Sequence, residues 1–290
     1  MNIDQILKKI KKFIPRSLFS FFQPAYHFFI SFFAAALYGF PSRRLIVLGV
    51  TGTKGKTTVI ELTREILKEA GAQVASLSSV RFQIGEKEEP NMRKMTMPGR
   101  FFVQKFLYDA VRAGCKYAVL EVTSEGVKQF RHRFIRFRAA AATNVAPEHL
   151  ESHGNFEKYL RAKLDLFWRL PPDGSAIINQ DDPAAERFAA ATTARRITYG
   201  KDGIEISGKT LAARDILING EGTAFEINGT AFSSKLLGEF NLYNIFCAVA
   251  LGLSQHTALG KIARAVARVN LIPGRMEFIP AFVKTSAGEQ

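Results

Sequence analysis

The fold is decided by the stretch Val47-Leu48-Gly49-Val50-Thr51-Gly52-Thr53-Lys54-Gly55-Lys56-Thr57-Thr58. Its apolar first half predicts a β-strand, and the following glycines and Gly-Lys-Thr predict a turn into a helix. Gly52 and Gly55 allow backbone N–H groups to approach phosphate oxygens, and Lys56 can reach the β- and γ-phosphates. The Thr57 hydroxyl can hold Mg²⁺ at the start of the helix. The stretch therefore predicts a nucleotide-phosphate site.

This motif departs from the strict Walker pattern at one position. The pattern requires glycine at position 50, where Val50 stands, and Gly49 lies one residue too early. The alternative is an ordinary strand-to-helix turn. The phosphate site is favoured because Gly-Lys-Thr directly after a strand is the context that supports it. Thr53, Lys54 and Thr58 are included in the candidate site.

Composition bounds the class of protein. A chain of 290 residues that is 47% apolar is long enough for one large or two modest domains with a buried core. Forty basic against 26 acidic residues give a net charge of +14, which suits phosphorylated substrates, nucleic acid or an anionic membrane. Cys115 and Cys247 make neither a disulfide framework nor a metal cluster, which favours a reducing, cytoplasmic setting. Both are expected in the core.

The first 44 residues form a basic and apolar segment. Residues 1–16 predict a basic amphipathic helix, and residues 17–42 carry no charge and are rich in phenylalanine. That length is sufficient to cross a bilayer, but Pro24, His27 and the basic residues at both ends favour an interfacial or hairpin-like anchor at least equally. An apolar helix packed on the following domain is the third possibility. A secretory signal is disfavoured because no small-residue cleavage site precedes Arg43.

The remainder alternates between strand and helix patterns. This alternation predicts an α/β fold of P-loop type, with a mainly parallel sheet and helices on both faces. Short alternating strands broken by glycines over 204–237 predict a small β-rich subregion on the same domain. Further strands are expected at 73–77, 117–122, 139–143, 176–178 and 196–199, a hairpin at 81–91, and helices at 57–70, 100–113, 156–170, 183–191, 241–254 and 257–269.

Polar residues follow several of these strands. In open α/β sheets ligands bind beyond the carboxyl ends of the strands, so such residues are candidates for the site. Glu121 closes one strand, and His149 lies in the segment that follows the next. A carboxylate and a neutral imidazole near a phosphate loop are reasonable Mg²⁺ ligands. The alternatives for a single such residue are a helix cap or a salt-bridge partner.

The order of the motifs resembles the central domain of the Mur ligase family, which builds the peptide stem of bacterial cell-wall precursors. The resemblance covers about residues 45–279. Its motifs are Gly52 to Thr58, Thr96-Met97-Pro98-Gly99, Glu121-Val122-Thr123-Ser124, Thr143-Asn144 to His153-Gly154, Ala162-Lys163-Leu164-Asp165-Leu166-Phe167, Asn179 to Pro183, Gly238 to Asn244, and Pro273-Gly274-Arg275-Met276-Glu277. We accordingly expect an N-terminal segment at 1–44, an ATP-binding central domain at 45–280 and a tail at 281–290.

The resemblance implies roles for individual residues. Lys56 would bind ATP phosphates, Thr57 and Glu121 one Mg²⁺, and His149 a second. Lys163 stands where the family carries a carbamylated lysine that holds metal, whereas helical periodicity alone favours a surface lysine. Asn241 and Asn244 match adenine contacts, and Arg275 matches a residue near the phosphates. Thr96, Thr123, Ser124 and Arg131 match positions around the UDP-N-acetylmuramoyl-peptide substrate.

The implied reaction is ATP-dependent peptide ligation through an acyl phosphate, in the cytoplasm or at the inner face of the membrane. Two alternatives stay open: the Mur-domain subunit of a lipid-linked amidotransferase, and a membrane-attached ATP-binding module without full catalysis. The amidotransferase usually carries a four-cysteine zinc insert, which Cys115 and Cys247 cannot build. Folate-polyglutamylating relatives match the Pro273 to Glu277 motif less well.

Three departures from the family pattern stand out. Thr123-Ser124-Glu125 replaces the usual Ser-Ser-His, the segment 1–44 stands in place of the usual UDP-binding domain, and the amino-acid-binding domain is not found after Glu277. A truncated or split gene, with a separate C-terminal domain as partner, is the expectation. The basic run from Lys128 to Arg138 is interpreted as a solvated edge or a cradle for a substrate diphosphate, not as a nucleic-acid site.

Overall fold

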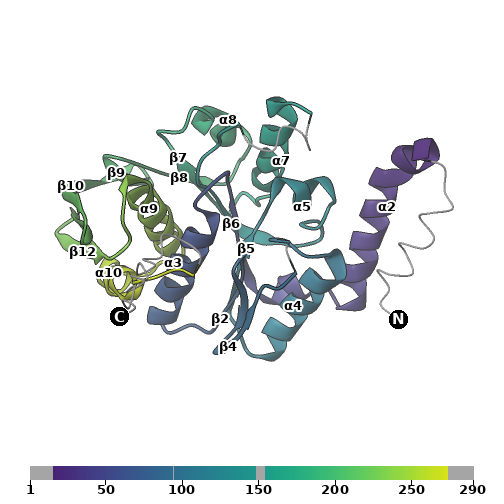
Figure 1. The fold of residues 1–290 in the computed structure, drawn as a ribbon, viewed down its shortest axis with the longest axis horizontal. Coiled ribbons are helices and arrows are strands. Elements are labelled where there is room, and N and C mark those ends of the chain that lie inside the picture. Colours follow the sequence, from purple (N-terminus) through teal and green to yellow (C-terminus); the bar gives the residue numbers. More distant parts are fainter. Residues whose placement is uncertain (1–15, 94, 148–153, 274–290) are drawn as a thin grey trace, which may run out of the picture.

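The computed structural model of the chain describes residues 16–93, 95–147 and 154–273, with side chains from residue 22 onward (Figure 1). Strand β1, Ile46–Thr51, lies between two parallel neighbours, β5 (Tyr117–Glu121) and β6 (Phe137–Ala142). Leu48 and Val50 join one hydrophobic cluster and Val47 the other. Because alternate residues of a strand point to opposite faces, β1 is buried on both.

One sheet runs through the domain in the order β12-β11-β10-β9-β8-β7-β6-β1-β5-β2-β3-β4. The central strands from β8 to β2 pair in parallel, and both ends are antiparallel. The other strands are β2 Val74–Leu77, β3 Arg81–Ile84, β4 Lys87–Pro90, β7 Ser175–Asn179, β8 Arg195–Gly200, β9 Gly203–Ile206, β10 Lys209–Asn219, β11 Gly222–Ile227 and β12 Thr230–Ser234. The predicted hairpin and β-rich subregion are thus extensions of the parallel sheet.

Helices cover both faces of the sheet (Figure 1). On one face lie α3 (Lys56–Glu69), α9 (Glu239–Ser254) and α10 (Leu259–Arg268), whose apolar residues share a cluster with Leu48 and Val50. On the other lie α4 (Arg100–Arg112), α5 (Ser124–Lys128), α7 (Phe156–Trp168) and α8 (Ala185–Ala190), packed with Val47. The predicted α/β class with helices on both faces is confirmed, and both cysteines are buried and free.

The described part of the N-terminal segment consists of α2 (Arg16–Leu37) and a short 3₁₀ helix, η1 (Pro41–Arg44), which precedes β1. One face of α2 lies against the domain: Ala34 and Ala35 are fully buried, and the Ser31 hydroxyl donates to the Phe130 carbonyl at 2.9 Å. The packing predicted as the third possibility is therefore present. Within the part of the chain that the structure describes, no helix is both long and apolar enough to cross a membrane.

The basic run from Lys128 to Arg138 is predicted from the sequence to be a solvated edge or a cradle for a diphosphate. The first of these alternatives is wrong for His132, which is buried. The His132 side chain is 1% exposed, and its Nε2 lies 2.5 Å from the Asp165 carboxylate of α7. The turn that delivers it has Phe130 and Phe134 in the left-handed region, at φ 56° and 61°. The contact between His132 and Asp165 therefore holds this turn against α7.

We expect the stability of the fold to fall as pH drops below about 6.5, the ordinary pKa of histidine. Burial lowers the pKa of His132 against the opposing effect of Asp165, while Arg169 and Arg133 also lower it. Below the unfolded-state pKa the unfolded chain then binds more protons than the folded chain, so acid favours unfolding. The melting temperatures at about pH 7.5 and about pH 5.5 should differ less in His132→Gln than in the unaltered chain. The glutamine amide keeps a hydrogen-bond donor but does not take up a proton in this pH range. An equal difference in both proteins would contradict this.

Candidate active site

The loop between β1 and α3 has a backbone that only glycine adopts readily at two points. Gly52 has φ 146° and Gly55 has φ 83°. A Cβ on Gly52 would lie 1.8 Å from the Thr143 hydroxyl, and one on Gly55 would lie 2.1 Å from the Asn244 side-chain oxygen. Both glycines therefore permit the positive φ and the close approach of neighbouring elements. Lys56 begins α3 directly after Gly55, so the first N–H groups of the helix face this loop.

Gly52→Ala should disrupt the loop. The added Cβ meets Thr143, and strain at such a position is of the order of 1–3 kcal/mol. We expect a melting temperature several degrees lower and a marked loss of affinity for Mg-ATP. Gly71→Ala is the matched control, since Gly71 also has positive φ (94°) but a Cβ added there would have nothing within 4 Å. Equal effects of the two substitutions would show that the contact with Thr143 is unimportant.

A lysine, a threonine and a glutamate converge at the start of α3. The Thr57 hydroxyl donates to Glu121 Oε2 at 3.1 Å, and Lys56 Nζ lies 3.9 Å from Glu121 Oε1. The Lys56 ammonium also donates to the Gly52 and Thr53 carbonyls. Glu121 is 2% exposed and closes β5 next to β1, which explains how two distant parts of the sequence meet. The predicted neighbourhood of Lys56, Thr57 and Glu121 is thus present.

Lys163 is buried beside the same loop. Its side chain is 1% exposed, its ammonium donates to the Gly52 carbonyl at 2.7 Å, and it lies 4.2 Å from the centre of the Tyr159 ring. Lys56 and Lys163 therefore share one acceptor oxygen, and positive charge is concentrated at Gly52. The surface lysine that periodicity favoured is wrong, because helix α7 turns this residue toward the loop.

The segment after β6 holds the loop in place. Asn144 accepts from the Lys54 N–H at 3.0 Å, and the Thr143 hydroxyl donates to the Lys54 carbonyl at 2.6 Å. The segment is itself held by the next strand, because Asn179 donates to the Thr143 carbonyl and Asp182 accepts from the Val145 N–H. The 179–183 motif therefore supports the β1–α3 loop indirectly, through the segment after β6.

Asn241 and Asn244 lie on the other side of the loop, at the start of α9. Asn244 Nδ2 donates to Asn241 Oδ1 at 3.0 Å, and Asn241 donates to the Leu237 carbonyl. Both side chains are at most 5% exposed. The structure brings this pair against Gly55, and its contact with adenine stays a prediction.

The four residues predicted to face the substrate gather at a second place. Arg131 donates to the carbonyl of Met97, which directly follows Thr96, and to the Gln129 side chain at 2.7 Å. Thr123 caps α5 by accepting from the Gly126 N–H at 3.0 Å, and Ser124 is largely buried beside it. Glu125, the departure from the family pattern, accepts from Gln129 at 2.7 Å. Glu125 and Arg131 are thus joined through Gln129.

Two predicted residues, His149 and Arg275, lie outside the described residues. Within 16–93, 95–147 and 154–273 no three histidine, cysteine or acidic side chains gather as a metal cluster. The oxygens present nevertheless fit Mg²⁺, since Thr57, Glu121 and the Ser79 hydroxyl are neighbours. Ser79 Oγ lies 2.8 Å from Thr57 Oγ1, and the Ser79 N–H donates to Glu121 Oε2 at 3.0 Å.

Ser79 and Tyr159 are the residues that sequence reasoning missed. The Tyr159 hydroxyl lies 3.0 Å from Thr53 Oγ1. Tyr159 precedes Lys163 by one helical turn, so the i, i+4 spacing was the available signal. Ser79 follows β2 and had no comparable signal.

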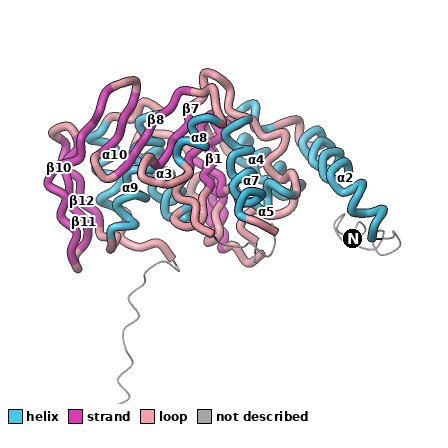
Figure 2. Tube along the Cα trace, turned by 90° about the horizontal axis from the view of Figure 1, so that it is seen from above, coloured by secondary structure: helices cyan, strands magenta, loops and turns pink. Residues whose placement is uncertain are grey.

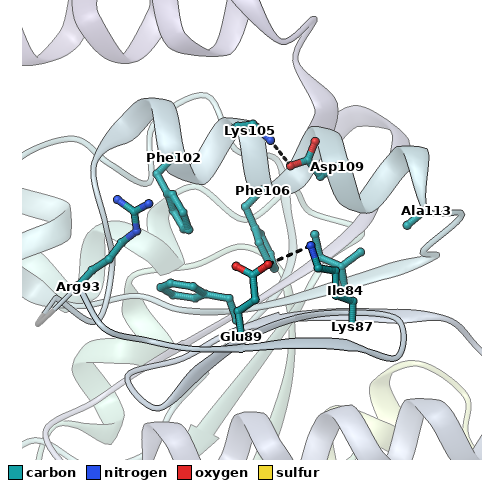
Figure 3. Close-up of a pocket in the computed structure, with 10 residues that line it drawn as sticks. Ile84, Lys87, Glu89, Arg93, Phe102, Lys105, Phe106, Asp109 and Ala113 are labelled. Atoms are coloured by element: carbon teal, nitrogen blue, oxygen red, sulfur yellow. Dashed lines mark hydrogen bonds and ion pairs between the residues drawn. The ribbon is translucent and has the colours of Figure 1, made fainter. Parts of the chain in front are cut away.

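The cavity of about 520 Å³ in Figure 3 lies elsewhere, between the β3–β4 hairpin and α4. Phe82, Phe102 and Phe106 line it, and Arg93 lies 4.2 Å from the centre of the Phe102 ring. None of the residues predicted for the site lines this cavity. We therefore place the candidate site at the β1–α3 loop.

Comparison with known proteins agrees with this geometry. The Mur ligase middle domain family matches residues 50–252. The chain is 35% identical over 266 residues to the UDP-N-acetylmuramyl-tripeptide synthetase of Roseiflexus sp. (strain RS-1), covering 86% of this chain and 52% of that protein. It is 36% identical over 249 residues to the UDP-N-acetylmuramoyl-L-alanyl-D-glutamate--2,6-diaminopimelate ligase of Gloeobacter violaceus, covering 84% and 49%.

Solved structures lead to the same family. A UDP-N-acetylmuramoyl-L-alanyl-D-glutamate--2,6-diaminopimelate ligase superposes with a TM-score of 0.69 at 27% identity, covering 82% of this chain and 49% of that one. The chain thus spans about half the length of the curated relatives it matches. The matched span of 50–252 contains the β1–α3 loop, Glu121, Lys163 and Asn244. The chain therefore belongs to the Mur ligase middle domain family.

Proposed function

We propose that this chain is the ATP-binding core of an ATP-dependent peptide ligase of peptidoglycan precursor synthesis. The observation that carries the proposal is the convergence of Lys56, Thr57, Glu121 and Lys163 at one loop. The loop lies at the carboxyl end of β1, where open α/β sheets bind ligands. The relatives named as a synthetase and a ligase support the assignment. In this proposal residues 45–280 form the ligase central domain, with 1–44 before it and 281–290 as a tail.

In the proposed site the loop N–H groups from Gly52 to Thr58 hold the nucleotide phosphates, together with Lys54 and Lys56. The Lys56 ammonium neutralises negative charge that develops on the transferring phosphoryl group. This electrostatic stabilisation is strongest where water is excluded from the site. Asn241 and Asn244 contact the adenine, and Arg275 lies near the nucleotide phosphates. Thr96, Thr123, Ser124 and Arg131 orient the substrate carboxylate.

Thr57, Glu121, His149 and a carbamylated Lys163 are the residues that would hold Mg²⁺. Held there, the metal would offset the negative charge of the phosphate oxygens. Glu121 already accepts hydrogen bonds from Thr57 and Ser79, so its carboxylate is held facing the loop. A carbamate on Lys163 would exchange an ammonium donor for two acceptor oxygens.

The proposed reaction has two steps. A carboxylate oxygen of the UDP-N-acetylmuramoyl-peptide attacks the γ-phosphorus, and ADP leaves. An amine then attacks the acyl-phosphate carbon, loses a proton, and phosphate leaves. The chain supplies no covalent nucleophile in this scheme. We infer a cytoplasmic location, next to the inner face of the membrane, and a separate C-terminal domain as the partner that binds the amine.

The proposal is tested first by titrating the purified chain with Mg²⁺ and a non-hydrolysable ATP analogue in a calorimeter. Saturable binding that requires Mg²⁺ is expected. Phosphate release is then measured with ATP, UDP-N-acetylmuramoyl-L-alanyl-D-glutamate and an amino acid. Release that depends on the peptide substrate supports the ligase, and binding without any such release favours the ATP-binding module. Absence of nucleotide binding would overturn the proposal.

A further inference from the structure

One face of α2 is apolar and unusually open to solvent. Among the side chains of α2 that the structure describes, four large apolar ones point outward along one stripe of the helix. Their exposed fractions are 55% for Phe22, 66% for Phe29, 59% for Phe33 and 57% for Leu37. Phe28 and Phe32 flank the stripe and are 39% and 45% exposed, although both also contact Phe134. Exposed apolar stripes of this kind mark interaction surfaces. We call these six residues the outer face of α2.

The opposite face of α2 packs against the domain. His27 contacts Arg100 of α4, and Ser31 bonds the Phe130 carbonyl. The helix is therefore held in one orientation, with its outer face turned away from the sheet. Figures 1 and 2 both show α2 at one end of the molecule, leaning away from the other helices. The helix presents most of its apolar stripe to solvent, and Phe33 also lies against the Phe101 ring of α4, with 6.4 Å between ring centres.

Charge indicates which partner fits. The sequence from 17 to 42 contains no charged residue, and basic residues stand at both ends, with Arg16 before and Arg43 and Arg44 after. Arg43 and Arg44 are exposed at the base of the helix. The outer face has no charged or amide side chain that would give a protein interface its specific hydrogen bonds, while one sign of charge at the ends complements anionic lipid.

We propose that the outer face of α2 docks on the surface of an anionic lipid bilayer. The phenylalanines enter the boundary between headgroups and acyl chains, and Arg43 and Arg44 lie at the headgroups. The helix rests on the bilayer and does not cross it. This inference stands independently of the ligase reaction. It also places lipid near the turn that carries Arg131, because Phe28 and Phe32 of the outer face contact Phe134 of that turn.

The test is flotation of the whole chain with vesicles of equal parts phosphatidylglycerol and phosphatidylcholine. Phe22→Ser/Phe29→Ser/Phe33→Ser should bind these vesicles at least about tenfold more weakly than the unaltered chain. Met92→Ser/Leu217→Ser/Leu271→Ser is the matched control, because it removes exposed apolar residues that lie outside α2; its vesicle binding should be unchanged. Circular dichroism and Mg-ATP affinity confirm that each variant is folded.

Substitution of the basic residues and added salt separate the contribution of charge from that of apolar contact. Arg43→Ala/Arg44→Ala should weaken binding to the anionic vesicles, and added salt should do the same. Equal flotation of the triple phenylalanine variant and the unaltered chain would overturn the proposal. So would a chain that binds no vesicles and instead sediments as a dimer that the triple variant abolishes, since the outer face would then be a contact between two copies. Loss of vesicle binding in the control triple would also refute it.

Discussion

Replacing Lys56 by alanine is expected to abolish measurable turnover and to weaken Mg-ATP binding by roughly tenfold to a hundredfold or more. A hydrogen bond to a charged group is worth about 1.5–3 kcal/mol, and this side chain is the cation nearest the start of α3. The fold should survive, because the ammonium contacts loop carbonyls and the Glu121 carboxylate, and its removal takes no apolar volume from the core. Calorimetry with a non-hydrolysable ATP analogue measures the affinity, and thermal unfolding without nucleotide measures the fold.

Lys68→Ala is the matched control for this substitution. Lys68 stands near the other end of the same helix and pairs with the exposed Glu86. The control removes the same charge from α3 and should leave ATP affinity and melting temperature nearly unchanged, because surface pairs contribute little. If Lys56→Ala binds Mg-ATP as tightly as Lys68→Ala does, the phosphate role proposed for Lys56 is wrong.

Lys163→Ala is expected to lower Mg²⁺-dependent turnover by about tenfold to a hundredfold, since changes to groups that support a metal site commonly cost a factor in this range. Short carboxylic acids should restore part of the turnover if the working group is a carbamate, because they return two oxygens to the same place. The chain treated with ¹³C-bicarbonate should show a carbamate signal that is missing from the variant. Phosphate release and carbon NMR measure the two effects.

Lys158→Ala on the same helix controls for the loss of a lysine from α7. Its side chain is exposed, whereas Lys163 is buried against the Gly52 carbonyl and the Tyr159 ring. We expect Lys158→Ala to retain turnover. If Lys163→Ala loses turnover without a carbamate signal in the unaltered chain, and carboxylates do not restore it, Lys163 acts through its ammonium on the loop. Full activity of Lys163→Ala would refute both roles.

Much of the fold could be read from local patterns. The run from Val47 to Thr58 is buried on both faces of β1 and then turns at Gly52 and Gly55, as its apolar residues and glycines predicted. Alternation of strands and helices predicted a sheet covered on both faces, since period-2 and period-3.6 patterns are local properties. The length of the sheet was not predictable in this way. Its antiparallel ends depend on pairing between β2 and β3 and between β8 and β9.

Parts of the candidate site were also within reach of the sequence, because Lys56, Thr57 and Glu121 lie at predicted strand ends or in a recognisable loop. Lys163 shows the limit of this reasoning. Its position in an amphipathic helix does not reveal whether it faces solvent, and only the packing of α7 against the sheet buries its ammonium beside Gly52. Ser79 and Tyr159 reach Thr57 and Thr53 from elements distant in sequence.

The sequence by itself therefore determined the class of fold, the glycine-bearing loop between β1 and α3 and the membership of the family, all of which depend on short runs of neighbouring residues. Tertiary structure alone decided which distant side chains meet. It turned Lys163 toward the loop, joined Arg131 to the segment of Thr96 and Met97, and left one side of α2 exposed while Ser31 and Ala35 were buried. The physical reason is that burial and contact are set by how whole elements pack, whereas propensity and turn chemistry act over a few residues.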